Sequence, residues 1–75
     1  MAVTENLALY TEKRGINLAA MSRATGISYS TLYASLRDKN RKRALSVDEA
    51  VLVCKFLGEK VEDFADDPES GKKVV

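Results

Sequence analysis

The chain contains no histidine, no tryptophan and a single cysteine, Cys54. One cysteine cannot form a disulfide within the chain, and a structural zinc site needs a set of cysteine or histidine ligands that this sequence does not offer. Histidine, the side chain most often used as a general acid or base, is also missing, so nothing is placed to activate the Cys54 thiol. We therefore predict no metal, no cofactor and no enzymatic activity, and we interpret Cys54 as a small, reduced, buried hydrophobic residue.

Long apolar runs are absent as well. The longest, residues 50–57, is interrupted by Lys55 and is too short to cross a bilayer. The first residues lack the basic stretch followed by an apolar segment that marks a signal peptide. We therefore expect a cytoplasmic protein without membrane association. Its 75 residues are expected to form one small domain that is stabilised by helix packing or by dimerisation.

The net charge of +1 conceals three blocks of different sign. Residues 13–43 contain eight Lys or Arg residues and one acid, Asp38, which gives a net charge of +7. The flanking residues 1–12 and 44–75 carry −2 and −4. A basic block of this kind is typical of proteins that bind polyanions such as nucleic acids.

Apolar residues recur at helical spacing, and no segment alternates like a β-strand. The pattern predicts an all-α fold of four or five short helices, at residues 5–13, 18–25, 29–37, 47–57 and 61–64. The side chains expected to cap the first four are Thr4, Asn17, Ser28 and Ser46, the last within a Ser46-x-x-Glu49 capping box. The glycines expected to end helices are Gly15, Gly26 and Gly58.

Residues 16–36 form the most informative segment. Two short helical patterns meet at Gly26, where glycine permits the positive φ of a tight turn. Ile27 is expected to fill the space between the two helices, and Leu32 and Leu36 to anchor the second helix on the core. This spacing is typical of a helix-turn-helix, in which one helix rests on the DNA backbone and the other enters the major groove.

The helix expected at residues 47–57 is apolar on nearly all sides. Such a helix is buried on more than one side, so we expect it to form the centre of the core. Val53 and Phe56 are candidates for a dimer contact. The alternative is that both residues belong to the core of a single chain.

From Asn17 to Leu36, and onward to Leu57-Gly58-x-x-Val61-x-x-Phe64, the chain resembles the phage repressor/Cro-like helix-turn-helix superfamily. The resemblance covers roughly residues 5–65 and includes Ser30-Thr31-Leu32-Tyr33. It implies a compact, lambda-repressor-like domain at residues 1–65. The polar residues that follow predict a flexible tail at residues 66–75. The resemblance further implies a sequence-specific transcriptional regulator of a prokaryotic cell or a phage-infected host, which binds a double-stranded DNA operator as a homodimer.

In this superfamily the helix at residues 29–37 is the recognition helix. Carried over by position, the residues that face the bases are Ser28, Tyr29, Ser30, Tyr33, Ala34 and Arg37. The resemblance implies that Arg37 reads guanine or reaches a phosphate, and that Ala34 touches a thymine methyl group. The expected phosphate contacts are Asn17, Lys39, Asn40, Arg41, Lys42 and Arg43. With about four to six such contacts, log K should fall with log salt at a slope of about −4 to −5 per monomer.

Ser22 and Ser35 depart from the superfamily pattern. A small alanine usually occupies the first position, and an apolar residue often anchors the recognition helix at the second. We expect the neighbouring Leu36 to take over this anchoring role.

The base-facing residues offer few strong readers, and the total charge is close to neutral. These features leave a second hypothesis open. The same fold would serve a small phage modulator or anti-repressor that binds a larger phage repressor, or an antidote that binds a toxin. In that case the recognition helix itself would be the surface that binds protein.

Overall fold

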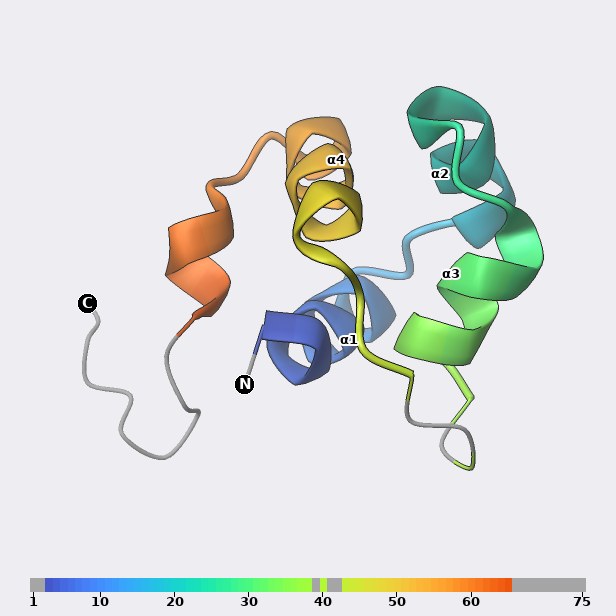
Figure 1. Ribbon diagram of the computed structural model, residues 1–75, viewed down its shortest axis with the longest axis horizontal. Helices are drawn as coiled ribbons and strands as arrows, with labels where there is room; N and C mark the ends of the chain where they lie inside the picture. The colour runs from blue at the N-terminus through green and yellow to red at the C-terminus, as the bar shows by residue number, and fades with distance from the viewer. Residues whose placement is uncertain (1–2, 39, 41–42, 66–75) are drawn as a thin grey trace.

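The computed structural model describes residues 3–38, 40 and 43–65. Its elements, in chain order, are α1 Val3–Lys13, α2 Leu18–Thr25, α3 Tyr29–Leu36, α4 Val47–Leu57 and the 3-10 helix η1 Val61–Phe64. α4 lies between the α2–α3 pair and η1, with α1 below it (Figure 1). The described residues contain no β-strand, and the predicted all-α fold is confirmed. The predicted flexible tail, residues 66–75, lies outside the described residues.

Polar side chains begin α2, α3 and α4 as predicted. Asn17 Oδ1 accepts a hydrogen bond from the third amide of α2 at 3.1 Å, and Ser28 Oγ accepts one from the third amide of α3 at 3.2 Å. At α4, Ser46 Oγ accepts from the Glu49 amide at 3.1 Å, and the Glu49 carboxylate accepts from the Ser46 amide at 2.9 Å. These hydrogen bonds give a partner to backbone amides at the start of each helix, where no carbonyl group of the same helix is available.

The prediction that Thr4 caps the first helix is wrong. Thr4 lies within α1, which begins at Val3, and its hydroxyl oxygen accepts a hydrogen bond from the Leu45 amide at 2.9 Å. The hydroxyl therefore joins α1 to the segment that leads into α4. Because Leu45 is 41 positions away in the chain, local spacing could not reveal this contact.

The core lies where the four α-helices meet. The largest side chains that are less than 2 % exposed are Leu7, Thr11, Met21, Leu32, Leu36 and Val53. The burial of Val53 within one chain contradicts its predicted role in a dimer contact. α4 directs Val53 inward together with Ala50 and Cys54. This burial raises the pKa of the Cys54 thiol. The interpretation of Cys54 as a buried hydrophobic residue is confirmed.

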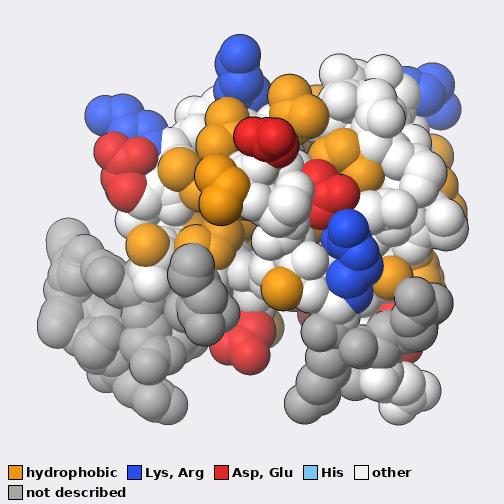
Figure 2. Space-filling view, in the orientation of Figure 1, with side chains coloured by type: hydrophobic (Ala, Val, Ile, Leu, Met, Phe, Trp, Pro, Cys, Tyr) orange, Lys and Arg blue, Asp and Glu red, His pale blue; other side chains and the backbone are white. Residues whose placement is uncertain are grey.

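α4 has one buried side and one exposed side. Its exposed large apolar residues are Val47, Val51, Leu52 and Phe56. Figure 2 shows hydrophobic side chains gathered over α4 on the face toward the viewer, with an acidic side chain among them. The sequence predicted a helix buried on more than one side, whereas within a single chain one side of α4 stays exposed.

η1 closes the bundle against α1. The ring of Phe64 meets that of Tyr10 edge to face, with centroids 5.2 Å apart, and Asn6 donates to the Phe64 carbonyl at 2.8 Å. The Tyr10 hydroxyl donates to the Glu59 carboxylate at 2.9 Å, and this bond raises the pKa of Tyr10.

Among the described residues, no helix has both the length and the apolar character that a bilayer crossing requires.

Candidate nucleic-acid interface

Hydrogen bonds as well as glycine fix the turn between α2 and α3. Gly26 has a φ of 79°, and its amide donates to the Ser22 carbonyl at 2.9 Å. The Ser22 hydroxyl donates to the Ile27 carbonyl at 2.6 Å. The Thr25 hydroxyl accepts from the Ile27 amide at 3.2 Å and donates to the Met21 carbonyl at 2.7 Å. The serine that departs from the superfamily pattern therefore ties the turn to α2 and sets the direction in which α3 starts.

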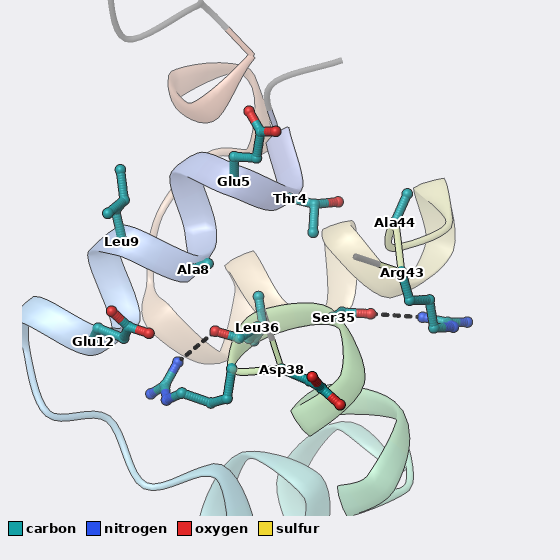
Figure 3. A pocket seen from close by; sticks show the side chains of 11 residues that line it. Thr4, Glu5, Ala8, Leu9, Glu12, Ser35, Leu36, Asp38, Arg43 and Ala44 are labelled. Carbon is teal, nitrogen blue, oxygen red and sulfur yellow. Dashed lines mark hydrogen bonds between the residues drawn. The ribbon is translucent and has the colours of Figure 1, made fainter. Parts of the chain in front are cut away.

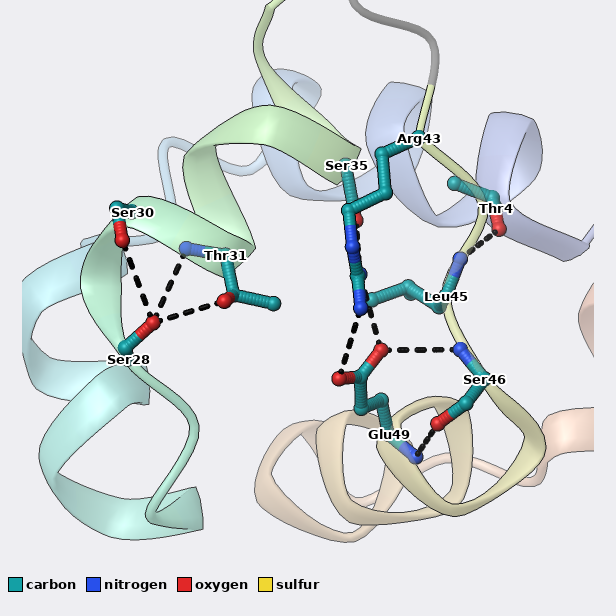
Figure 4. Close-up of polar contacts among 9 residues, drawn as sticks. All are labelled: Thr4, Ser28, Ser30, Thr31, Ser35, Arg43, Leu45, Ser46 and Glu49. Carbon is teal, nitrogen blue, oxygen red and sulfur yellow. Dashed lines mark hydrogen bonds and ion pairs between the residues drawn. The ribbon is translucent and has the colours of Figure 1, made fainter.

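The exposed side of α3, together with its N-cap residue, presents rings and hydroxyl groups to solvent. Tyr29 and Tyr33 are 51 % and 45 % exposed, with ring centroids 6.2 Å apart. The exposed Ser28 hydroxyl donates to the Thr31 hydroxyl at 2.8 Å and lies 3.4 Å from the Ser30 hydroxyl (Figure 4). Four predicted base-facing residues are thus exposed together, and we call them the α3 face: Ser28, Tyr29, Ser30 and Tyr33.

The last three residues of α3 are buried. Leu36 is 1 % exposed and anchors the helix, as expected from the sequence. Ala34 is 5 % exposed, which contradicts its predicted contact with a thymine methyl group, because its short side chain lies beneath those around it. Ser35 is 9 % exposed, and its hydroxyl accepts a hydrogen bond from Arg43.

Arg37 directly follows α3 and turns toward α1. Its Nη1 donates to Thr11 Oγ1 at 2.9 Å and to the Leu36 carbonyl at 3.1 Å, while Nη2 donates to the Ile16 carbonyl at 3.4 Å. Thr11 is fully buried, and a buried acceptor left without a donor is costly. This conformation disfavours the predicted contact of Arg37 with guanine, because both terminal nitrogens are directed at acceptors within the protein. Arg37 instead joins the end of α3 to α1 and the α1–α2 connection.

Arg43 joins α3 to α4. Its Nη1 donates to Ser35 Oγ at 2.8 Å, and its two terminal nitrogens meet the two Glu49 carboxylate oxygens at 3.0 and 3.1 Å (Figure 4). The ion pair is partly accessible, with side-chain exposures of 36 % for Arg43 and 21 % for Glu49. Hydrogen bonds from Arg43, followed by the bond from the Ser46 backbone, lower the pKa of Glu49. Arg43 and Arg37 thus hold the buried end of α3 from two directions.

We predict that Glu49→Gln lowers the free energy of unfolding by about 1 kcal/mol at neutral pH, the upper end for a partly exposed ion pair. Glutamine keeps the capping box but removes the charge. Because the pKa of Glu49 is lowered on folding, the pair's contribution is present above the unfolded pKa of about 4.3 and is lost as pH falls through the folded value. Urea unfolding at neutral and acidic pH should therefore show wild type and variant converging in acid. A gap of the same size at both pH values would contradict the charge-based role.

A groove of about 610 Å³ lies between α1 and the segment that follows α3 (Figure 3). The carboxylates of Glu5, Glu12 and Asp38 line it. Its two guanidinium groups, those of Arg37 and Arg43, are bound within the protein. A cavity with this distribution of charge disfavours a phosphate backbone, so the groove is a poor candidate for contact with nucleic acid.

The predicted phosphate-contacting residues are described only in part. Asn17 is exposed at the start of α2, and because Oδ1 serves as the cap, its Nδ2 group remains available to donate to a phosphate. Asn40 is exposed, and its backbone amide donates to the Asp38 carboxylate at 2.9 Å. The residues that lie outside the described part of the chain are Lys39, Arg41 and Lys42.

Sequence reasoning missed the positions that fix the end of α3. Thr11 gave no signal, because a threonine on an amphipathic helix is usually only a surface residue. Glu49 was predicted as part of a capping box but not as the partner of Arg43. An acid at this position, shortly after a basic block, is the one pattern that could have suggested the ion pair.

A family model described as the Cro/C1-type HTH DNA-binding domain matches residues 6–70. A search of curated proteins gave no significant match, and a search of solved structures gave none. The match spans most of the chain and includes α2, the turn at Gly26, α3 and α4. The chain therefore belongs to the Cro/C1-type helix-turn-helix DNA-binding domain family.

Proposed function

We propose that the protein is a sequence-specific transcriptional regulator that binds double-stranded operator DNA as a homodimer. The α3 face enters the major groove, while the start of α2 and the basic loop after α3 contact phosphates. The observation that carries this proposal is the α3 face, which is exposed on a helix whose last three residues are buried and held by two arginines. A rigid helix with one free end suits insertion into a groove.

The α3 face reads bases with hydroxyl groups and rings. Tyrosine and serine hydroxyls can donate to or accept from base edges, and tyrosine rings can contact thymine methyl groups. Within α3 and its N-cap there is no side-chain amide or guanidinium group, the donors that discriminate adenine and guanine most strongly. Specificity per base pair is therefore modest, and pairing of two half-sites and DNA shape contribute the rest.

Phosphate contacts come from Asn17 and from three loop cations, Lys39, Arg41 and Lys42. Arg37 and Arg43 are left out of this set, since their guanidinium groups are bound to Thr11 and to Glu49. Asn17 is neutral and displaces no counterion. Three cations per chain therefore supply the electrostatic part of the binding energy.

We predict that log K falls with log salt at a slope of about −3 per monomer, from −0.9 for each of three contacts. This slope is less steep than the slope of −4 to −5 expected from the whole basic block. Fluorescence anisotropy with a duplex operator, selected from a random pool, over a series of salt concentrations would measure it. A steeper slope would mean that Arg37 or Arg43 also reaches a phosphate. Absence of binding to any duplex at low salt would refute the proposed function.

A second candidate function is an anti-repressor or an antidote that binds a repressor or a toxin. The uncharged aromatic character of the α3 face favours it, because tyrosine is enriched at the energetic centres of protein interfaces. Under this function the protein would bind no DNA at low salt but would bind a repressor or a toxin encoded next to it. Binding assays with both kinds of ligand separate the two candidates.

A further inference from the structure

We propose that two copies of the chain pair through the exposed side of α4, with the two α4 helices antiparallel across a two-fold axis. This inference rests on the homodimer of the proposed function and names its contact surface. The surface, which we call the α4 face, consists of the exposed residues of this helix: Val47, Asp48, Val51, Leu52, Lys55 and Phe56.

The α4 face exposes four large apolar side chains. Val47 is 77 % exposed, and Val51, Leu52 and Phe56 are each 38–39 % exposed. These residues are contiguous on one side of the helix, and the hydrophobic side chains over α4 are visible in Figure 2. A contiguous apolar patch on the surface marks a site of protein contact.

The positions of the charges on this face indicate which partner it fits. Asp48 and Lys55 are seven residues apart, almost two helical turns, and therefore lie along one line on the helix. The midpoint between them falls between Val51 and Leu52. Each charge lies about 5 Å from that midpoint along the helix axis. The face therefore has an apolar centre with opposite charges at equal distances on either side.

A two-fold contact brings the same surface of two subunits together, so it must be complementary to itself. With antiparallel helices centred on the midpoint, Asp48 faces the partner subunit's Lys55, and Lys55 faces the partner subunit's Asp48. Val51 and Leu52 pack at the axis, and Val47 and Phe56 lie at the edges. A parallel pairing would place like charges opposite one another. The α4 face thus fits a second copy of this chain in one orientation.

Pairing through α4 is compatible with operator binding. The α3 face belongs to a different helix and shares no residue with the α4 face. A contact limited to the α4 face therefore covers neither α3 face. The contact is small, so we expect a weak dimer in solution whose population depends on protein concentration.

The test is a set of charge reversals measured by sedimentation equilibrium on the full chain without DNA. In Asp48→Lys, both Asp48–Lys55 pairs between the subunits become lysine–lysine pairs. In Lys55→Asp, both become aspartate–aspartate pairs. Each single variant should weaken the dimer by about 10- to 30-fold. Mixing the two variants should restore association as a heterodimer, because one chain then carries two lysines and the other two aspartates. The double variant D48K/K55D should again form a homodimer.

Glu62→Lys, an exposed acid-to-lysine change on η1, is the matched control and should leave the dimer unchanged. Circular dichroism checks that all variants fold. A wild-type chain that is monomeric at all concentrations, or single variants that associate like wild type, would overturn the inference. A failure to restore association on mixing would also overturn it. Because no DNA is present, these outcomes are separate from the test of operator binding.

Discussion

Replacing Arg37 with alanine is expected to lower the free energy of unfolding by about 2–3 kcal/mol, because hydrogen bonds from a charged donor to the Thr11 hydroxyl and the Ile16 carbonyl are lost. In a domain of this size such a loss corresponds to a decrease in Tm of about 10–20 °C. Urea and thermal unfolding followed by circular dichroism would measure both quantities.

Two variants serve as comparisons. Arg23→Ala removes an exposed arginine from α2 and should change the free energy of unfolding by no more than about 0.5 kcal/mol. Arg37→Lys keeps the positive charge but cannot reach several acceptors at once, so it should lose most of the same stability. If Arg37 instead binds phosphate in the complex, Arg37→Ala would leave stability intact and weaken DNA binding. That result would contradict the role that we assign to this side chain.

Replacing both Tyr29 and Tyr33 with alanine is expected to weaken operator binding about 100-fold without destabilising the fold. Each lost base contact costs about 1–3 kcal/mol, so two together reach the 3 kcal/mol that corresponds to this factor. Both rings are about half exposed, and truncation of exposed side chains changes stability little. Anisotropy with a selected operator gives the affinity, and urea unfolding gives the stability.

Phenylalanine variants at the same two positions separate the ring from the hydroxyl. Retained affinity in Tyr29→Phe and Tyr33→Phe would assign base reading to ring contacts, whereas a loss would assign it to hydroxyl hydrogen bonds. The salt dependence should be the same in all of these variants, because no phosphate contact changes. Unchanged operator affinity in the double alanine variant would show that the α3 face does not read DNA.

The local signals in the sequence were sufficient for the framework of the helix-turn-helix. Asn17, Ser28 and Ser46 cap helices as predicted, and Gly26 has the positive φ that its place between two helices required. These features depend on contacts within a few residues of each other. The chemistry of the side chain and its spacing from the next element therefore carry all of the information needed.

The roles of the charged and buried residues could not be predicted in the same way. Arg37 turns toward Thr11, which is 26 positions earlier, and Thr4 accepts a hydrogen bond from a residue 41 positions later. Position in the superfamily pattern suggested that Arg37 and Ala34 contact bases, but exposure depends on what surrounds a side chain. The burial of Val53 is a further example, since periodicity on an apolar helix does not say which side meets the core.

By itself, the sequence determined which segments are helical, where α2, α3 and α4 begin, and that a basic helix-turn-helix lies at residues 16–43, because caps, glycine turns and apolar spacing act over short distances. Only the tertiary structure decided that Arg37 and Arg43 are bound within the protein and which side of α4 is exposed. Both depend on acceptors and surfaces that distant segments bring together, such as the Thr11 hydroxyl and the Glu49 carboxylate.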